Sequence, residues 1–218
     1  MEISTSGSGD RLFEDSGVLM NQRTGLIGAM LVLIFLVLPT NPGYAKGKST
    51  AFFEGLSFTT VGFSKENKTV LVEVNDYQRG TYISVYKTRN GEKVKDYRVE
   101  EGQTKSKLKA LKRKGVMDDP GEPGAVSPKD GTTITGIFNG KDMALQVQAG
   151  TTLGFLDVLP LPVSEPRVTQ ARIKGIHWDS KGKTVAIVVT WEFEENALQP
   201  SDTLHVYRYR PWKIRWQE

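Results

Sequence analysis

The sequence predicts a mainly β fold in which antiparallel meanders form a sandwich or partial-propeller arrangement, with one short surface helix. Two observations lead to this class. Apolar and polar residues alternate over short segments that are separated by Gly, Pro, Asn and Asp, as in strands joined by tight turns. One such segment also occurs twice, because residues 61–74 align without gaps with residues 176–189.

The repeated segment has the pattern of two strands joined by a polar turn. An aromatic residue, Phe63 or Trp178, ends the first strand, and Lys-Thr-Val opens the second strand. Every second residue of that strand is apolar, so these residues share one face of a sheet. They are Val70, Val72 and Val74 in the first copy and Val185, Ile187 and Val189 in the second. Residues 82–87 then correspond to residues 203–208, which adds a third strand to each copy.

The first copy continues into a hairpin and a helix. Asn90 and Gly91 are typical of a tight two-residue turn and predict a hairpin strand over residues 92–98. Residues 100–114 predict a short surface helix, because acidic residues stand at the start, basic residues stand toward the end and Gly115 provides a stop. The apolar anchors of this helix are Leu108, Ala110 and Leu111.

The remaining elements complete a single domain over residues 46–218. Residues 118–130 are rich in Pro, Gly and Asp and predict a loop or linker. Strands are expected at residues 132–138, 143–149 and 152–158. The domain then contains a first repeat at about 57–98, the helix and linker at 100–130, the middle strands at 132–158 and a second repeat at about 172–210.

The repeated segment resembles the blade motif of TolB-type β-propellers, in which an aromatic residue, an Asp-Gly-Lys turn and a strand begin a meander. The second copy has Trp178, then Asp-Ser-Lys-Gly-Lys, then a β-branched strand and Leu-His-Val-Tyr. Residues 52–212 also resemble a family of predicted secreted bacterial proteins known only as a domain of unknown function, which implies export but no particular activity. Consecutive blades start about 40 to 45 residues apart, and these copies are much farther apart, so the resemblance implies blade-like meanders and no closed propeller.

Residues 20–45 are laid out like a secretory signal peptide. Arg23 supplies the basic n-region, and residues 26–38 form an apolar run that is shorter than the roughly 18 to 20 residues of a membrane span. Gly43 and Ala45 are the small residues of a cleavage site, so the peptidase is expected to cut after Ala45. The mature protein is therefore expected in the periplasm or the medium.

Two alternatives stay open at the N-terminus. Residues 24–40 could act as a single uncleaved membrane anchor, although Lys46 and Lys48 would then lie on the side where positive charge is disfavoured. The chain could also start at Met1, but the position of the signal favours Met20 as the true start.

Composition limits the partners and the chemistry. The chain has 29 Lys and Arg against 25 Asp and Glu, and residues 46–218 keep 27 basic and 21 acidic residues, a net charge of +6. A basic exported protein tends to meet polyanions, here an anionic envelope polymer, lipid head groups or another envelope protein, whereas nucleic acid is not expected. The chain has no cysteine, which excludes disulfides and thiolate chemistry.

Few residues are suited to catalysis or to metal binding. His177 and His205 are the only histidines and do not occupy matching positions in the two copies, so we predict no metal site and no cofactor. His205 is expected to be a half-exposed strand residue that shares a face with Thr203, Tyr207 and Tyr209. Serine-hydrolase and nucleotide-binding motifs are absent from the sequence.

A pair of carboxylates gives the alternative of an enzyme. Glu192 and Glu194 lie on one face of a strand, and the strand rise sets them roughly 6 to 7 Å apart. Trp191 beside them could stack on a sugar. This arrangement would suit an envelope carbohydrate-active enzyme. Adjacent strand carboxylates more often form a solvated strand end, so the sequence favours a protein without catalysis.

The C-terminus alternates basic and aromatic residues, which suits the binding of phosphate groups at an interface. Its candidate binding residues are Arg208, Arg210, Lys213 and Arg215. They could form one basic surface with the cations of the predicted helix, which are Lys105, Lys107, Lys109, Lys112, Arg113 and Lys114. In the alternative interpretation this segment is an ordinary closing strand, with Trp212 and Trp216 packed on the core.

The function that these observations favour is an exported, non-catalytic binding or structural module of the bacterial cell envelope. An accessory protein that binds another protein through a propeller-like face would have the same fold.

Overall fold

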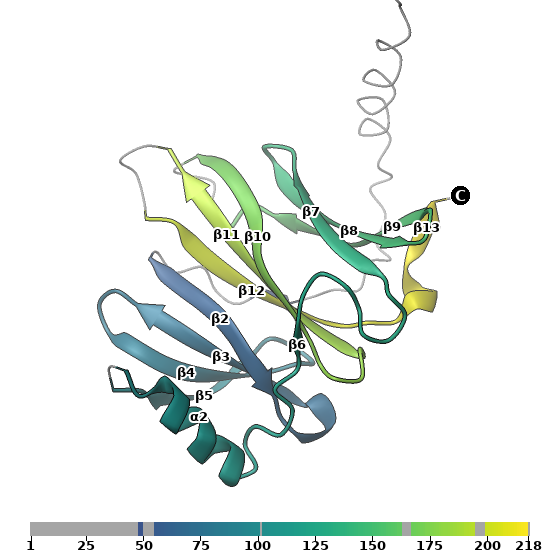
Figure 1. Cartoon of the computed structure of the whole chain (residues 1–218). Coiled ribbons are helices and arrows are strands. Elements are labelled where there is room, and N and C mark those ends of the chain that lie inside the picture. Colours follow the sequence, from purple (N-terminus) through teal and green to yellow (C-terminus); the bar gives the residue numbers. More distant parts are fainter. Residues whose placement is uncertain (1–47, 50–54, 101, 163–166, 195–198, 218) are drawn as a thin grey trace, which may run out of the picture. The chain divides into compact units, whose positions relative to one another are not determined.

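The computed structural model describes residues 48–49, 55–100, 102–162, 167–194 and 199–217, and Figure 1 shows them as antiparallel sheets with one α-helix. The predicted mainly β class is confirmed. The predicted signal peptide, residues 20–45, lies outside the described residues. Within the described ranges, no helix has both the length and the apolar character needed to cross a membrane.

The described strands form three sheets. The N-terminal sheet is a meander in the order β2-β3-β4-β5, with β2 at Leu56–Phe63, β3 at Thr69–Asp76, β4 at Gly80–Lys87 and β5 at Lys93–Arg98. The outer sheet has the order β13-β9-β8-β7, with β7 at Thr133–Phe138, β8 at Asp142–Ala149, β9 at Thr152–Pro160 and β13 at Arg215–Gln217. The central sheet has the order β1-β12-β11-β10-β6, with β1 at Lys48–Ser49, β6 at Glu122–Pro123, β10 at Val168–Trp178, β11 at Thr184–Phe193 and β12 at Ser201–Arg208.

The central sheet is apolar on both faces, because its strands are covered by both other sheets. Val185, Ile187 and Val189 of β11 pack in one core cluster with residues of the outer sheet, including Met143 and Leu145. The alternate residues of β11 and β12 pack in a second cluster with one face of the N-terminal sheet; these are Ala186, Val188, Leu204 and Val206. The three sheets therefore stack as layers with the central sheet between the other two.

A buried carboxylate also joins the N-terminal sheet to the central sheet. Asp202 of β12 accepts hydrogen bonds from the backbone N–H of Phe58 at 2.7 Å and from the Thr190 hydroxyl at 2.6 Å. The ammonium group of Lys174 lies 2.6 Å from the same carboxylate. This network satisfies a charge that would otherwise be costly to bury, and alternation alone does not reveal it.

Helix α2, Thr104–Arg113, covers the second face of the N-terminal sheet. Leu111 is buried and Leu108 is partly buried against Leu71 and Ile83 of that sheet. The predicted start at residue 100 is wrong. Gly102 has a φ of 72°, a left-handed conformation that a helix cannot contain, so the helix begins at Thr104 and has no acidic residue in its first turn.

Residues 118–130 are more ordered than a linker. The carbonyl of Asp119 accepts a hydrogen bond from the backbone N–H of Phe63 at 2.7 Å, and β6 pairs with the end of β10. The predicted hairpin after β4 is present, but its connection covers residues 88–92 instead of two residues. The backbone N–H of Lys87 donates to the carbonyl of Glu92 at 2.9 Å, which closes this wider turn.

The two sequence copies pair in the same way beside their turns and between their second and third strands. Farther from the turn the pairing of their first two strands differs, because Thr60 pairs with Val72 whereas Ile176 pairs with Ile187. Phe63 is paired with Val70 in the first meander, which is β2-β3-β4-β5. Trp178 is paired with Val185 in the second meander, which is β10-β11-β12. Both aromatic residues are fully buried. The apolar face of β3 packs on the central sheet, and the equivalent face of β11 packs on the outer sheet, so the two meanders stack in the same sense.

Candidate anion-binding surface at the C-terminal segment

The C-terminal segment crosses from the central sheet to the outer sheet. Strand β12 ends at Arg208, a short 3-10 helix, η3, covers Pro211–Lys213, and β13 then pairs with β9. Tyr209 is buried and holds the start of the crossing, since its ring meets the Trp178 ring edge-on at 5.1 Å between centroids. The indole N–H of Trp216 donates to the carbonyl of Pro211 at 3.2 Å, which fixes the end.

Three of the four cations predicted for binding come together at this crossing. Arg208, Arg210 and Lys213 line a hollow of about 20 Å³ together with Phe155 and Leu156. Within the part of the chain that the structure describes, none of the three cations has a carboxylate within ion-pair distance. The hollow has room for about one water-sized group. The side chain of Arg215 lies outside the described residues.

The two tryptophans of the segment have different surroundings. Trp216 is partly buried against the core cluster between the central and outer sheets, as a closing strand would require. Trp212 is 73% exposed, so the expectation that both rings pack on the core is wrong for this residue. Residue 212 lies in η3, in which no residue is buried.

Lys129 is an additional cation that the sequence does not connect with this surface. Its ammonium group lies 5.8 Å from the centroid of the Trp212 ring. The loop over residues 118–130 brings it there through its contacts with the second meander, such as the close approach of Gly182 to the backbone of Lys129. No local pattern in the sequence signals this contact.

The helix cations do not belong to the same surface. Helix α2 packs on the N-terminal sheet, whereas the C-terminal segment packs on the outer sheet, on the other side of the central sheet. The interpretation of one continuous basic surface is therefore wrong, and the structure has two separate groups of cations.

The paired carboxylates do not form a site with Trp191. The Glu192 carboxylate lies 3.3 Å from the guanidinium of Arg172, and Glu194 is exposed beyond the end of β11. Trp191 lies on the opposite face of the strand, is 1% exposed and donates its indole N–H to the hydroxyl of Thr203 at 2.8 Å. A ring buried in this way cannot stack on a sugar.

His205 is buried and not half-exposed as expected. The polar alternation of β12 suggests a solvent face, but the outer sheet covers that face. The Nε2 atom of His205 lies 2.8 Å from the Thr203 hydroxyl, and its Nδ1 atom has no partner among the described residues. Burial lowers the pKa of His205 to about 4 because it disfavours the charged imidazolium.

His177 has a structural contact of its own. Its Nε2 atom lies 2.6 Å from the carbonyl oxygen of Pro120, beside the loop that crosses the second meander. The described residues contain no group of three or more His, Asp or Glu side chains that could hold a metal ion.

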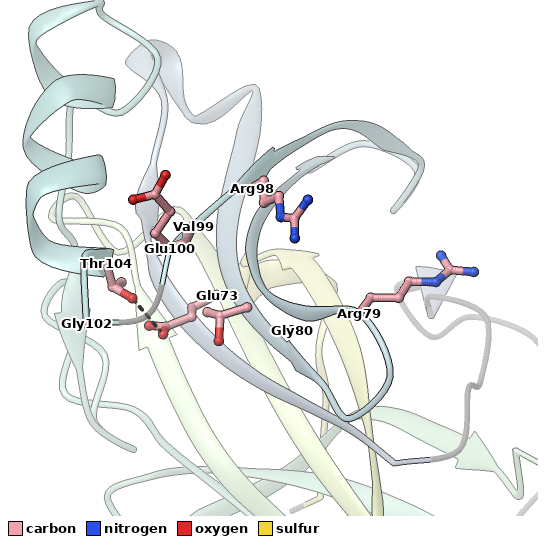
Figure 2. Close-up of a pocket in the computed structure, with 9 residues that line it drawn as sticks. Glu73, Arg79, Gly80, Arg98, Val99, Glu100, Gly102 and Thr104 are labelled. Carbon is pink, nitrogen blue, oxygen red and sulfur yellow. Dashed lines mark hydrogen bonds between the residues drawn. The ribbon is translucent and has the colours of Figure 1, made fainter.

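A second hollow, of about 780 Å³, lies beside the start of α2 (Figure 2). Its charged lining residues have both signs, with Arg79 and Arg98 against Glu73 and Glu100. The Glu73 carboxylate accepts a hydrogen bond from the hydroxyl of Thr104 at 3.1 Å, which ties α2 to β3. The mixed charges favour neither an anion nor a cation, and the sequence gives no sign of this hollow.

Comparison of the chain with protein-family models, with curated proteins and with solved structures found no match.

Proposed function

We propose that this chain is an exported, non-catalytic binding module of a bacterial cell envelope, which binds phosphate groups through Arg208, Arg210 and Lys213. The observation that carries the proposal is the meeting of these three cations around one small hollow, without a carboxylate partner among the described residues. Export is proposed from the signal-like residues 20–45 of the sequence.

The chemistry of the surface suits a phosphate group. Guanidinium groups can donate two parallel hydrogen bonds to phosphate oxygens, and a neighbouring ammonium adds charge. The hollow between the cations can admit one oxygen-sized group. The exposed Trp212 ring stands beside them and suits the boundary between water and lipid, because its body is apolar and its N–H is polar.

The surface is also held in place before any ligand binds. Residues on both sides of η3 belong to sheets, and the backbone N–H of Lys213 donates to the carbonyl of Arg210 at 2.9 Å. A preformed site loses less conformational entropy on binding than a flexible tail does. This supports a binding role over that of a loose basic terminus.

We further propose that the two meanders are copies of one blade-like unit. Support comes from the turns, because the N–H of Ser64 donates to the carbonyl of Thr69 and the N–H of Asp179 donates to that of Thr184. The side-chain oxygens of Ser64 and Asp179 also accept from the N–H groups of the same two threonines.

The source of the phosphate can be tested by sedimentation of the mature protein with three kinds of particle. We expect co-sedimentation with vesicles that contain phosphatidylglycerol or with lipopolysaccharide, and none with vesicles of phosphatidylcholine alone. Binding to only one of the first two identifies the source. Binding should weaken as salt rises, because exposed charges are screened over about 8 Å at physiological ionic strength. Equal sedimentation with all three particles, or with none, would contradict the proposal.

A further inference from the structure

The strongest unexplained feature of the molecule is the charge of helix α2. Its ten residues and the residue that follows it carry six cations, which are Lys105, Lys107, Lys109, Lys112, Arg113 and Lys114. The helix contains no Asp or Glu. Within the described ranges, none of these cations forms an ion pair.

Much of this charge pattern disfavours the helix itself. Lys105 and Lys109, and then Lys109 and Arg113, are like charges one turn apart, and such pairs destabilise a helix by about 0.2 to 0.5 kcal/mol each. Lys105 and Lys107 also stand in the first turns, where the helix dipole favours acidic residues. Lys112 and Arg113 in the last turn suit the helix dipole, but the cations before them do not serve the stability of the isolated helix.

The two sides of α2 have different roles. Its apolar side packs on the N-terminal sheet through Leu108 and Leu111, so this side is not available to a ligand. The exposed side carries Lys105, Lys109 and Lys112, which are exposed residues on successive turns and span roughly 10 Å at 1.5 Å per residue. This row contains no exposed apolar side chain that could enter a bilayer, as an interfacial helix requires.

We propose that the exposed side of α2 is a second binding site, which takes a linear polymer bearing closely spaced phosphate groups. Its row of cations matches such a chain in sign and in form, and the binding would release condensed counterions from the polymer. The hollow at the start of the helix does not extend the row, because Glu73 and Glu100 there balance the charges of Arg79 and Arg98 (Figure 2). The inference does not depend on the function proposed for the C-terminal surface, because a different layer carries this site.

The test measures binding of long-chain inorganic polyphosphate to the mature protein and to two variants with equal net charge. The helix variant carries Lys105→Gln, Lys109→Gln, Lys112→Gln and Arg113→Gln. The matched control carries four neutral substitutions of exposed cations that belong to neither proposed binding surface, Arg89→Gln, Lys141→Gln, Arg167→Gln and Lys181→Gln. We expect the helix variant to bind polyphosphate roughly tenfold or more weakly with a smaller salt dependence, and the control to bind within about twofold of the wild type.

The other outcomes would overturn the inference. Equal weakening in both variants would mean that only net charge matters. Unchanged binding by the helix variant would place the polymer elsewhere. If the helix variant lost binding to anionic vesicles but still bound polyphosphate, the ligand of this helix would be a membrane surface. The melting temperature of the helix variant should stay close to that of the wild type, because the removal of like-charge pairs offsets the loss of Lys112 and Arg113 from the last turn; a clear decrease would show that these cations stabilise the fold.

Discussion

The ammonium group of Lys129 lies 5.8 Å from the centroid of the Trp212 ring, so a loop that follows the N-terminal sheet meets the C-terminal segment. The contact keeps an exposed aromatic ring beside the cations at residues 208–213 without burying it. Such a cation–π contact at an exposed site contributes about 0.5 to 1 kcal/mol. It orients the ring more than it stabilises the fold.

The first prediction separates binding from stability at the two tryptophans of the segment. Trp212→Ala should weaken vesicle binding but change the free energy of unfolding by no more than about 1 kcal/mol, because the side chain is 73% exposed. Trp216→Ala should destabilise the protein more, since that ring packs against the core. Urea denaturation and vesicle titration of both variants provide the measurement. A larger loss of stability in Trp212→Ala than in Trp216→Ala would contradict this assignment.

The second prediction concerns the aromatic residues at equivalent positions of the two meanders. Phe63 and Trp178 are both fully buried. Replacing either with alanine should cost about 3 to 5 kcal/mol, through lost burial and the cavity left behind. Chemical denaturation of each variant measures this cost. A loss below about 1 kcal/mol for either residue, the scale of a surface change, would show that the two positions are not equivalent.

The third prediction is an acid-dependent loss of stability caused by His205. Its pKa is about 4 in the folded protein, below its ordinary value of 6.5. As the pH falls from 6.5 toward 4, the unfolded chain binds a proton that the folded protein does not, so stability is lost over this range. The complete loss is about 3 kcal/mol, from 1.36 kcal/mol for each unit of pKa.

The measurement for His205 compares unfolding at pH 7.5 and at about pH 4.5 in the wild type and in His205→Asn. Other groups on the covered face of the central sheet, Tyr207 and Asp157, are common to both proteins. The wild type should lose about 2 to 3 kcal/mol more than the variant between these pH values. The same pH dependence in both proteins would exclude His205 as the cause.

The fourth prediction concerns export. Cleavage after Ala45 gives a mature protein that begins at Lys46, two residues before β1. Its intact mass, measured on protein from the envelope fraction, should match residues 46–218. A mass that retains residues 20–45 would support the membrane anchor instead.

Local alternation and turn residues are sufficient to predict the strands and their order within each meander, but not which sheet packs on which face. The valines of β3 were assigned to one face from their spacing, and the structure has them in one core cluster. His205 was misjudged because the same rule treats the face of Thr203 and Tyr207 as solvent, and only the packing of a third sheet on that face buries it. Periodicity within a strand carries no information about which sheet will cover it.

The sequence likewise predicts only part of the candidate site. The positions of Arg208, Arg210 and Lys213 along the chain were sufficient to group them, because they are close in sequence. Lys129 was missed because its contact with Trp212 depends on the course of a loop. The separation of this surface from α2 likewise depends on the stacking of sheets, which charge counts do not reveal.

The most direct test of the proposed function is the dissociation constant for phosphatidylglycerol-containing vesicles at low salt. The test variant is Arg208→Gln/Arg210→Gln/Lys213→Gln, and the control with the same charge is Arg89→Gln/Lys141→Gln/Lys181→Gln, three exposed cations elsewhere. We predict that the test variant binds at least about tenfold more weakly, since about 1 kcal/mol is expected for each cation near an anionic surface. The control should bind within about twofold of the wild type. Equal affinity of the test variant and the wild type would contradict the assignment of this surface.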